Sequence, residues 1–177
     1  MLYFAEGSST SELDRIRCQR LLEALVTSLG PCNRVLLIPP DYTRFHSGAG
    51  DLTVALFHLF SDAHVEVLPA LGTHCPMTDS QIRHMFPGIP SDCFRIHDWR
   101  NSLVDLGEVP ASFVHKVSCG RLNYPIRCQV NRTLVEDSWD AIISIGQLVP
   151  HEVAGIANHA KNIFVGTGGQ DTINRTH

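Results

Sequence analysis

The chain has 177 residues, 44% of them hydrophobic, so it is long enough to bury one sizeable core and falls in the range of one domain or slightly more. Its formal net charge of -4, with 14 Lys and Arg against 18 Asp and Glu, excludes the overall positive field that attracts nucleic acids or anionic membranes. Neither a signal peptide nor an apolar run of about 18 residues is present, so we expect a soluble, cytoplasmic protein that acts on a small molecule.

The first predicted element is a helix that ends at Gly30. Residues 9–12 have the S-x-x-E form of a capping box. Apolar residues follow at roughly helical spacing, namely Leu13, Ile16, Leu21, Leu22, Leu25 and Leu29. Gly30 and Pro31 then predict the end of this helix.

A βαβ unit is predicted next. Residues 35–38 and 65–68 are short apolar runs of the kind found in buried parallel strands, and residues 52–60 between them have a helical pattern. Residues 78–81 form a second capping box, which predicts a helix through Met85.

Between about 87 and 134 the periodicity weakens. Short β-prone runs occur at 94–96, 113–117 and 126–130, separated by turn residues, and we expect an irregular β-rich insertion there. The sequence thus predicts an α/β fold, with a Rossmann-like parallel or mixed sheet flanked by helices and this insertion.

The last third of the chain returns to a regular pattern. Residues 141–145 predict another buried strand, followed by a loop at 146–151 and a helix from Val153 onward. Residues 165–169 form a glycine-rich loop, which is either a phosphate cradle of backbone amides or a turn without a ligand. No repeat or linker marks a domain boundary, so residues 1–177 are interpreted as one domain.

Reactive side chains follow three of the predicted strands. Asp41 and Arg44 come after the first, His74 after the second, and His151 after the third. Ligands of open α/β sheets bind at the carboxyl ends of strands, so we expect these side chains to form one site. Two histidines are suited to acid-base catalysis, and an arginine can hold a carboxylate through two parallel hydrogen bonds. Each residue alone is also compatible with an ordinary loop role, such as an Asp that caps a turn.

Three longer motifs are more specific. They are residues 40–44 (PDYTR), residues 71–78 (LGTHCPMT), and residues 150–161 (PHEVAGIANHAK) with Gly168, Gly169 and His177 beyond them. In order and spacing these motifs resemble the lactate racemase family, from about Val35 to the end of the chain. The resemblance identifies the chain as an N-terminal catalytic and cofactor-binding domain.

By this resemblance the cofactor is a nickel pincer nucleotide, nickel pyridinium-3,5-bisthiocarboxylic acid mononucleotide. The resemblance implies that Lys161 forms a thioamide link to it and that His177 completes the coordination of nickel. Imidazole is a suitable ligand for Ni(II), which commonly adopts square-planar geometry. Enzymes that make the cofactor are then expected partners.

The resemblance also implies a reaction. His74 and His151 would exchange the hydroxyl proton on opposite faces of a 2-hydroxy acid, while Asp41 and Arg44 bind the substrate and orient the site. The α-hydrogen would leave as hydride to the cofactor and return to the other face, which makes the parent protein an isomerase, either a racemase or an epimerase. The substrate would be a short 2-hydroxy acid or a sugar acid.

Two features depart from the family pattern. The segment before the anchoring lysine is often glycine-rich, whereas residues 157–160 here read ANHA. The chain also stops at His177, while relatives continue into a second domain, so it is either a fragment or a degenerate homologue. We favour the fragment and expect the isolated chain to be inactive as a racemase.

Two other functions are compatible with the sequence. The first is a non-catalytic domain that binds a small ligand or nucleotide and lacks the cofactor. The second is a zinc-dependent hydrolase that uses His74, His151 and His177, although no H-E-x-x-H motif is present. The oligomeric state is not indicated by the sequence.

Overall fold

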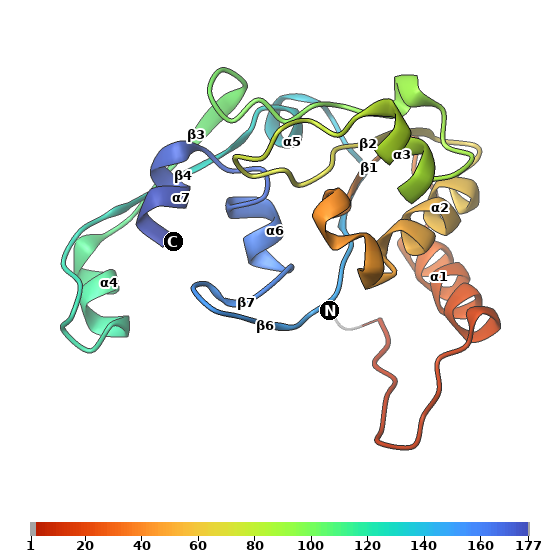
Figure 1. Cartoon of the computed structure of the whole chain (residues 1–177), viewed down its shortest axis with the longest axis horizontal. Helices are drawn as coiled ribbons and strands as arrows, with labels where there is room; N and C mark the ends of the chain where they lie inside the picture. The colour runs from red at the N-terminus through yellow and green to blue at the C-terminus, as the bar shows by residue number, and fades with distance from the viewer. Residues whose placement is uncertain (1–2, 177) are drawn as a thin grey trace.

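The computed structural model describes residues 3–176, and Figure 1 shows the arrangement of its elements. In chain order these are α1 (Arg15–Leu29), β1 (Arg34–Ile38), η1 (Tyr42–Ser47), α2 (Ala49–Leu59), β2 (His64–Val67), α3 (Asp79–Met85), η2 (Ser91–Cys93), β3 (Leu103–Val109), α4 (Ala111–Val117), β4 (Ile126–Asn131), α5 (Thr133–Glu136), β5 (Ala141–Ser144), β6 (Pro150–His151), β7 (Gly155–Ile156), α6 (Ala160–Phe164) and α7 (Gln170–Thr176).

A parallel sheet with the strand order β2-β1-β5 forms the centre of the fold. β1 is paired on both sides, and its residues 35–38 are fully buried, because a continuous apolar run can be covered on both faces of a sheet. The predicted βαβ unit is confirmed, since α2 connects the parallel strands β1 and β2. β5 confirms the strand that was predicted at 141–145 but not its burial, because its residues alternate between partly buried and exposed.

Hydrophobic residues pack on both faces of this sheet. The larger core lies between the sheet and helices α1, α2 and α3, which Figure 1 shows together on one side. Its buried members include Leu37 of β1, Leu56 of α2 and Met85 of α3. On the opposite face, Leu36 belongs to a smaller core that is completed by Ile163 of α6. Each fully buried leucine stabilises the fold by roughly 2 kcal/mol. The predicted α/β fold with flanking helices is confirmed.

Helix α1 begins later than its predicted capping box. Residues 9–12 lie outside the helix, and the hydroxyls of Ser8 and Ser11 are 2.7 Å apart within the preceding segment. The cap is instead Asp14, whose carboxylate accepts a 2.7 Å hydrogen bond from the amide of Arg17. The predicted stop at Gly30 is confirmed, with the glycine at a φ of 76°.

The other two predicted helices of this half are present. In α3, Thr78 and Gln81 form the predicted capping box, with both reciprocal hydrogen bonds in place. Helix α2 begins at Ala49, three residues before the predicted start, because Gly48 in the left-handed conformation ends η1 and leads directly into it.

The segment 87–134 contains the antiparallel pair β3–β4, and β4 confirms the predicted run at 126–130. β3 was not predicted. Its pairing shifts register between Asp105 and Glu108, and these polar residues break the alternation that marks a strand in the sequence.

Two other runs of this segment differ from the prediction. Residues 113–117 belong to helix α4, because Pro110 lies at its N-cap and its restricted backbone leads into a helix. In the run 94–96, Phe94 makes an isolated parallel bridge to Val67 of β2 rather than a longer strand.

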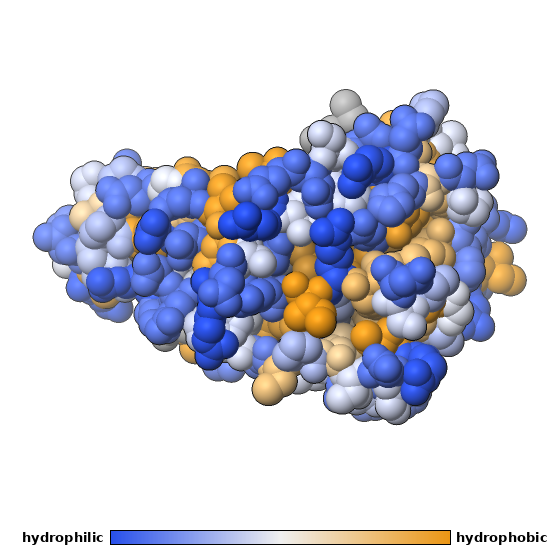
Figure 2. All heavy atoms as spheres, turned by 90° about the horizontal axis from the view of Figure 1, so that it is seen from above, coloured by the Kyte–Doolittle hydropathy of each residue, from blue (hydrophilic) through white to orange (hydrophobic). Residues whose placement is uncertain are grey.

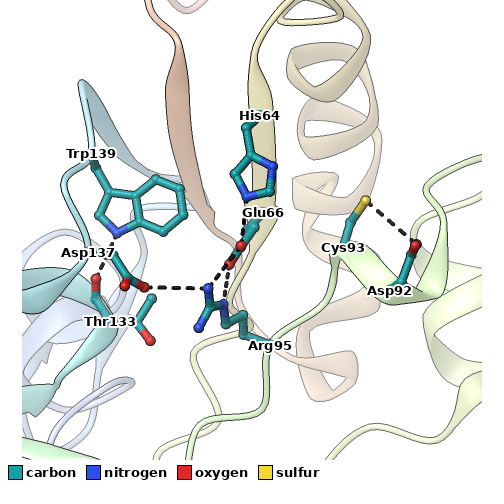
Figure 3. A network of polar contacts seen from close by, with 8 residues as sticks. All are labelled: His64, Glu66, Asp92, Cys93, Arg95, Thr133, Asp137 and Trp139. Carbon is teal, nitrogen blue, oxygen red and sulfur yellow. Dashed lines mark hydrogen bonds and ion pairs between the residues drawn. The ribbon is translucent and has the colours of Figure 1, made fainter.

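A polar network attaches this segment to the sheet (Figure 3). Arg95 donates two hydrogen bonds to Glu66 of β2, His64 lies 2.8 Å from the same carboxylate, and Arg95 also contacts Asp137 at 3.5 Å. Burial raises the pKa of Glu66, but the hydrogen bonds from Arg95 and His64 outweigh it, so the pKa lies below its ordinary value of 4.5. Glu66 therefore stays ionised in the fold.

The two edges of the central sheet differ. At the β2 edge, the amide of Arg95 donates a 2.8 Å hydrogen bond to the carbonyl of Val67. At the other edge, no strand among residues 3–176 pairs with the outer side of β5, and Ile142 is 41% exposed. Seen from above, the surface is mostly hydrophilic, with a few apolar patches (Figure 2).

The predicted helix from Val153 onward is wrong. Pro150 and His151 pair with Ile156 and Gly155 in the short antiparallel hairpin β6–β7, and the helix α6 begins only at Ala160. Gly155 at a φ of 80° and positive φ values just before Ala160 are incompatible with a continuous helix. The glycine-rich loop is a turn between α6 and α7.

Candidate active site

A cavity of about 370 Å³ lies beyond the carboxyl ends of β1, β2 and β5. Asp41 and Arg44 line it from the segment after β1, His74 from the loop after β2, and His151 and Lys161 from the segments after β5. The structure thus brings these five predicted residues around one cavity, while their catalytic and binding roles stay predictions. His177, the predicted nickel ligand, lies outside the described residues.

Backbone contacts hold the loops of the site together. Pro40 makes a parallel bridge with Ala70, which extends the pairing of the sheet past β1 and β2. The amide of Gly72 then donates a 2.8 Å hydrogen bond to the carbonyl of Gly166, in the turn after α6. The loop that carries His74 is therefore fixed to the segment that follows Lys161.

Asp41 orients His74. Nδ1 of His74 lies 2.7 Å from Oδ2 of Asp41, and the other carboxylate oxygen accepts a 2.5 Å hydrogen bond from the hydroxyl of Thr43. Asp41 is 6% exposed, whereas 58% of the His74 side chain is exposed. Because an ionised carboxylate can only accept, the proton of the neutral His74 ring lies on Nδ1, and the lone pair lies on Nε2. In this tautomer Nε2 can act as a base.

The contacts of the second histidine, His151, imply the opposite tautomer. Nδ1 of His151 accepts hydrogen bonds from the backbone amides of Val153 and Ala154, at 3.2 and 3.1 Å. The proton of the neutral ring is therefore on Nε2. Only 9% of this side chain is exposed, because the β6–β7 hairpin folds around it. The two imidazoles thus differ in tautomer and in exposure.

Two positively charged groups share the cavity wall. Burial lowers the pKa of Lys161 below its ordinary value of 10.5, and the charge of Arg44 lowers it further, against smaller opposing effects of Glu152 and Asp41. More of the amine is therefore neutral and nucleophilic than in an exposed lysine. Arg44 is suited to bind an anionic group in the cavity.

Three residues whose roles the sequence did not indicate connect the end of β5 to the start of α6. They are Ser144 at the end of β5 and Asn158 and Asn162 on either side of the lysine, and they are connected by hydrogen bonds. Asn162 is buried and also donates to the carbonyl of Ile38. No local pattern marks such residues, since their partners are far away in the chain.

The glycine-rich turn does not support a phosphate cradle at Gly166 to Gly168. The amides of Gly166, Thr167 and Gly168 already donate to the carbonyls of Lys161, Ile163 and Val165. A Cβ atom on Gly168 would lie 2.0 Å from the carbonyl oxygen of Phe164. Close packing of the backbone is therefore a sufficient reason for glycine here.

A metal site made of protein ligands alone is not supported within the described chain. Among residues 3–176, no group of three or more His, Cys, Asp or Glu side chains is arranged to hold a metal ion. The zinc site of His74, His151 and His177 thus gains no support from these residues. Within the same part of the chain, no helix is long and apolar enough to cross a bilayer.

Comparison with known proteins gives a family match. Residues 13–177 match the family model described as the lactate racemase N-terminal domain. A search of curated proteins gave no match.

The solved structures that are similar to the chain include the following two. The crystal structure of a protein from Thermotoga maritima has 29% sequence identity and a TM-score of 0.78, and the match covers 92% of this chain and 40% of that one. The structure of the lactate racemase apoprotein from Thermoanaerobacterium thermosaccharolyticum has 22% identity and a TM-score of 0.62, and the match covers 85% of this chain and 34% of that one. The match therefore spans less than half of each of these proteins, and the second likeness concerns the fold.

Proposed function

Because the chain belongs to the lactate racemase family, as its N-terminal domain, we propose that it carries the acid-base and cofactor-anchoring residues of a nickel-dependent racemase or epimerase of a 2-hydroxy acid. The parent protein is then an isomerase. One observation supports this proposal above the others: two histidines in opposite tautomers, an arginine and a partly buried amine line the same cavity.

Arg44 is proposed to bind the carboxylate of the substrate. Its guanidinium offers a fork of N–H donors that matches the two oxygens of a carboxylate. Lys161 and His74 line the same cavity as Arg44. The hydroxyl of a short 2-hydroxy acid is one carbon away from that carboxylate, so it can reach an imidazole of the site.

His74 is proposed to take the hydroxyl proton at Nε2. The imidazolium that forms is stabilised by Asp41, whose carboxylate contacts Nδ1 at 2.7 Å. His151 presents an N–H group from the β6–β7 hairpin, and this group can donate to the substrate oxygen. Acid-base catalysis of this kind accelerates a reaction by roughly 10²- to 10⁴-fold.

The residues of the cavity fit the cofactor of the family. Lys161 is the amine that would anchor it, and its lowered pKa favours the neutral form needed for acylation. His177 would supply an imidazole to nickel. When bound, the nickel pincer nucleotide supplies a hydride acceptor, which imidazoles and a guanidinium cannot provide.

The proposal concerns the whole parent protein. We expect the 177-residue chain by itself to be inactive as a racemase, because the match covers only 40% and 34% of the two similar solved structures. The enzymes that make the cofactor are the proposed partners of the chain.

Mass spectrometry tests the proposal directly. The chain is produced together with the cofactor-making enzymes, and a peptide spanning Lys161 is analysed for a covalent adduct that contains nickel or its sulfur ligands. The matched control is Lys161→Arg, which keeps the positive charge but cannot form the thioamide. An adduct on the wild type alone supports the proposal. Unmodified Lys161 in cells that load a known lactate racemase would favour the non-catalytic binding domain instead.

A further inference from the structure

The backbone directly before Lys161 adopts a conformation that is unusual for its residues. Asn158 and His159 have φ values of 60° and 54°, and the ψ of His159 is -131°. The amide of Lys161 donates a 3.1 Å hydrogen bond to the carbonyl of Asn158, which closes a turn. With His159 at its second position, this geometry corresponds to a type II′ turn, where glycine is strongly preferred.

A turn of this kind persists only where its surroundings hold it. Within residues 3–176, the exposed side chain of His159 makes no hydrogen bond that would stabilise the turn. The contacts come instead from Asn158, whose side chain packs against Gly146. A Cβ atom on Gly146 would lie 2.9 Å from the amide of Asn158. The space for this side chain thus depends on a glycine in the loop after β5.

Ser144 connects the residues on both sides of Lys161. Its hydroxyl donates a 3.2 Å hydrogen bond to Oδ1 of Asn158 and lies 3.2 Å from Nδ2 of Asn162. Asn162 also donates to the carbonyl of Ile38 at 2.9 Å, at the end of β1. The first turn of α6 is therefore attached to two neighbouring strands of the sheet.

We propose that Ser144, Asn158 and Asn162, which we term the Ser144 clamp, are positioning residues that fix the amine of Lys161 in the cavity. The clamp holds the turn that precedes Lys161 and docks the start of α6 on the sheet. Its relevance to catalysis rests on the proposed function, in which Lys161 is the anchor. The effect of the clamp on the Lys161 amine does not rest on the proposed function, and it can be measured without any cofactor.

The test measures the pH dependence of Lys161 acetylation by acetic anhydride in the full chain, followed by peptide mass spectrometry. In the wild type, the pH at which the acetylation rate is half-maximal is expected to lie below 10.5, the ordinary pKa of lysine. In Ser144→Ala, the amine is released toward solvent, so this midpoint moves up toward that value. A rise of one unit corresponds to about tenfold less neutral amine at neutral pH.

Three controls separate positioning from a general loss of stability. Ser144→Thr keeps the hydroxyl and should restore the wild-type midpoint. Thr53→Ala removes a buried hydrogen bond within α2, away from α6, and should lower the melting temperature without moving the midpoint. His159→Gly should raise the melting temperature, because glycine adopts the turn freely, and should leave the midpoint unchanged.

The proposal is overturned if Ser144→Ala and Asn158→Ala both titrate like the wild type, or if Thr53→Ala moves the midpoint as far as Ser144→Ala. The result is independent of the racemase proposal. If Ser144→Ala shifts the midpoint but Lys161 never acquires an adduct, the proposal of the Ser144 clamp is supported and the proposal that Lys161 anchors the cofactor is contradicted.

Discussion

Nδ1 of His74 lies 2.7 Å from the carboxylate of Asp41, although the two residues are 33 positions apart in the chain. Asp41 is buried and is also held by Thr43, so its position does not depend on the histidine. His74 is the exposed partner of the pair, with more than half of its side chain accessible to solvent. The aspartate thus determines which nitrogen of His74 faces the cavity with a lone pair.

The first prediction is that the neutral rings of His74 and His151 adopt opposite tautomers. His74 should carry its proton on Nδ1 and His151 on Nε2, because Asp41 accepts from the former and backbone amides donate to the latter. Nitrogen-15 NMR of the imidazoles at pH 8 distinguishes the two forms. Finding the same tautomer at both sites would contradict the proposed division into a base and a donor.

Asp41→Asn provides the control for this measurement. An asparagine amide can donate as well as accept, so the exclusive preference of His74 for a proton on Nδ1 should be lost. The spectrum of His151 should not change, since its partners lie in the β6–β7 hairpin.

The second prediction concerns buried His97. Its Nε2 lies 3.0 Å from the carbonyl of Gly168, and its Nδ1 lies 3.0 Å from the side-chain amide of Asn131. Burial lowers its pKa below the ordinary value of 6.5. The unfolded chain therefore gains a proton at a higher pH than the folded one, and the free energy of unfolding should fall as the pH drops below about 6.5 toward the folded pKa.

Urea denaturation between pH 5 and 8 checks this dependence. His97→Gln keeps one donor and one acceptor but does not titrate, so the decline at acid pH should become shallower. His97→Ala removes both hydrogen bonds and should cost about 2 kcal/mol at pH 8. An unchanged slope in His97→Gln would show that other groups cause the acid sensitivity.

The third prediction concerns the network around Glu66. Arg95→Met removes two hydrogen bonds from a largely buried carboxylate, and should lower the free energy of unfolding by about 1–2 kcal/mol, since Arg95 itself is 40% exposed. Glu66→Leu combined with Arg95→Met should cost less than the sum of the two single changes, because a largely buried carboxylate is then not left without its arginine. Additive effects in this double-mutant cycle would argue against a direct interaction.

The fourth prediction concerns the turn between α6 and α7. Gly168→Ala places a methyl group 2.0 Å from the carbonyl oxygen of Phe164, so the two segments must move apart at a cost of roughly 1–3 kcal/mol. A lower melting temperature would show this. Gly7→Ala is the matched control, since nothing lies within 4 Å of its Cβ, and it should have almost no effect.

The sequence was sufficient to predict the elements that depend on local patterns. The strand at 35–38 is a continuous apolar run and is buried, the strand at 141–145 is mostly apolar but half-exposed, and the Thr78 capping box is a local contact. The errors occurred where a local signal was weak or misleading. Residues 113–117 are β-prone, yet they follow Pro110 in a helix, and Val153 begins a turn rather than a helix.

The candidate site also contains residues that the sequence could predict and residues that it could not. Asp41, His74 and His151 could be predicted to meet, because each follows a strand of one parallel sheet. The Ser144 clamp could not be predicted, because its hydrogen bonds depend on the final packing of α6. Asn162, for example, bonds to Ile38 across 124 positions of the chain.

The difference between the two edges of the central sheet has a consequence for assembly. The outer side of β2 is contacted by Phe94 and Arg95, whereas no strand within the described part of the chain pairs with the outer side of β5. A strand from another polypeptide segment can therefore extend this sheet next to β5. Such an added strand would lie beside Ser144, near the start of α6, the helix that carries Lys161.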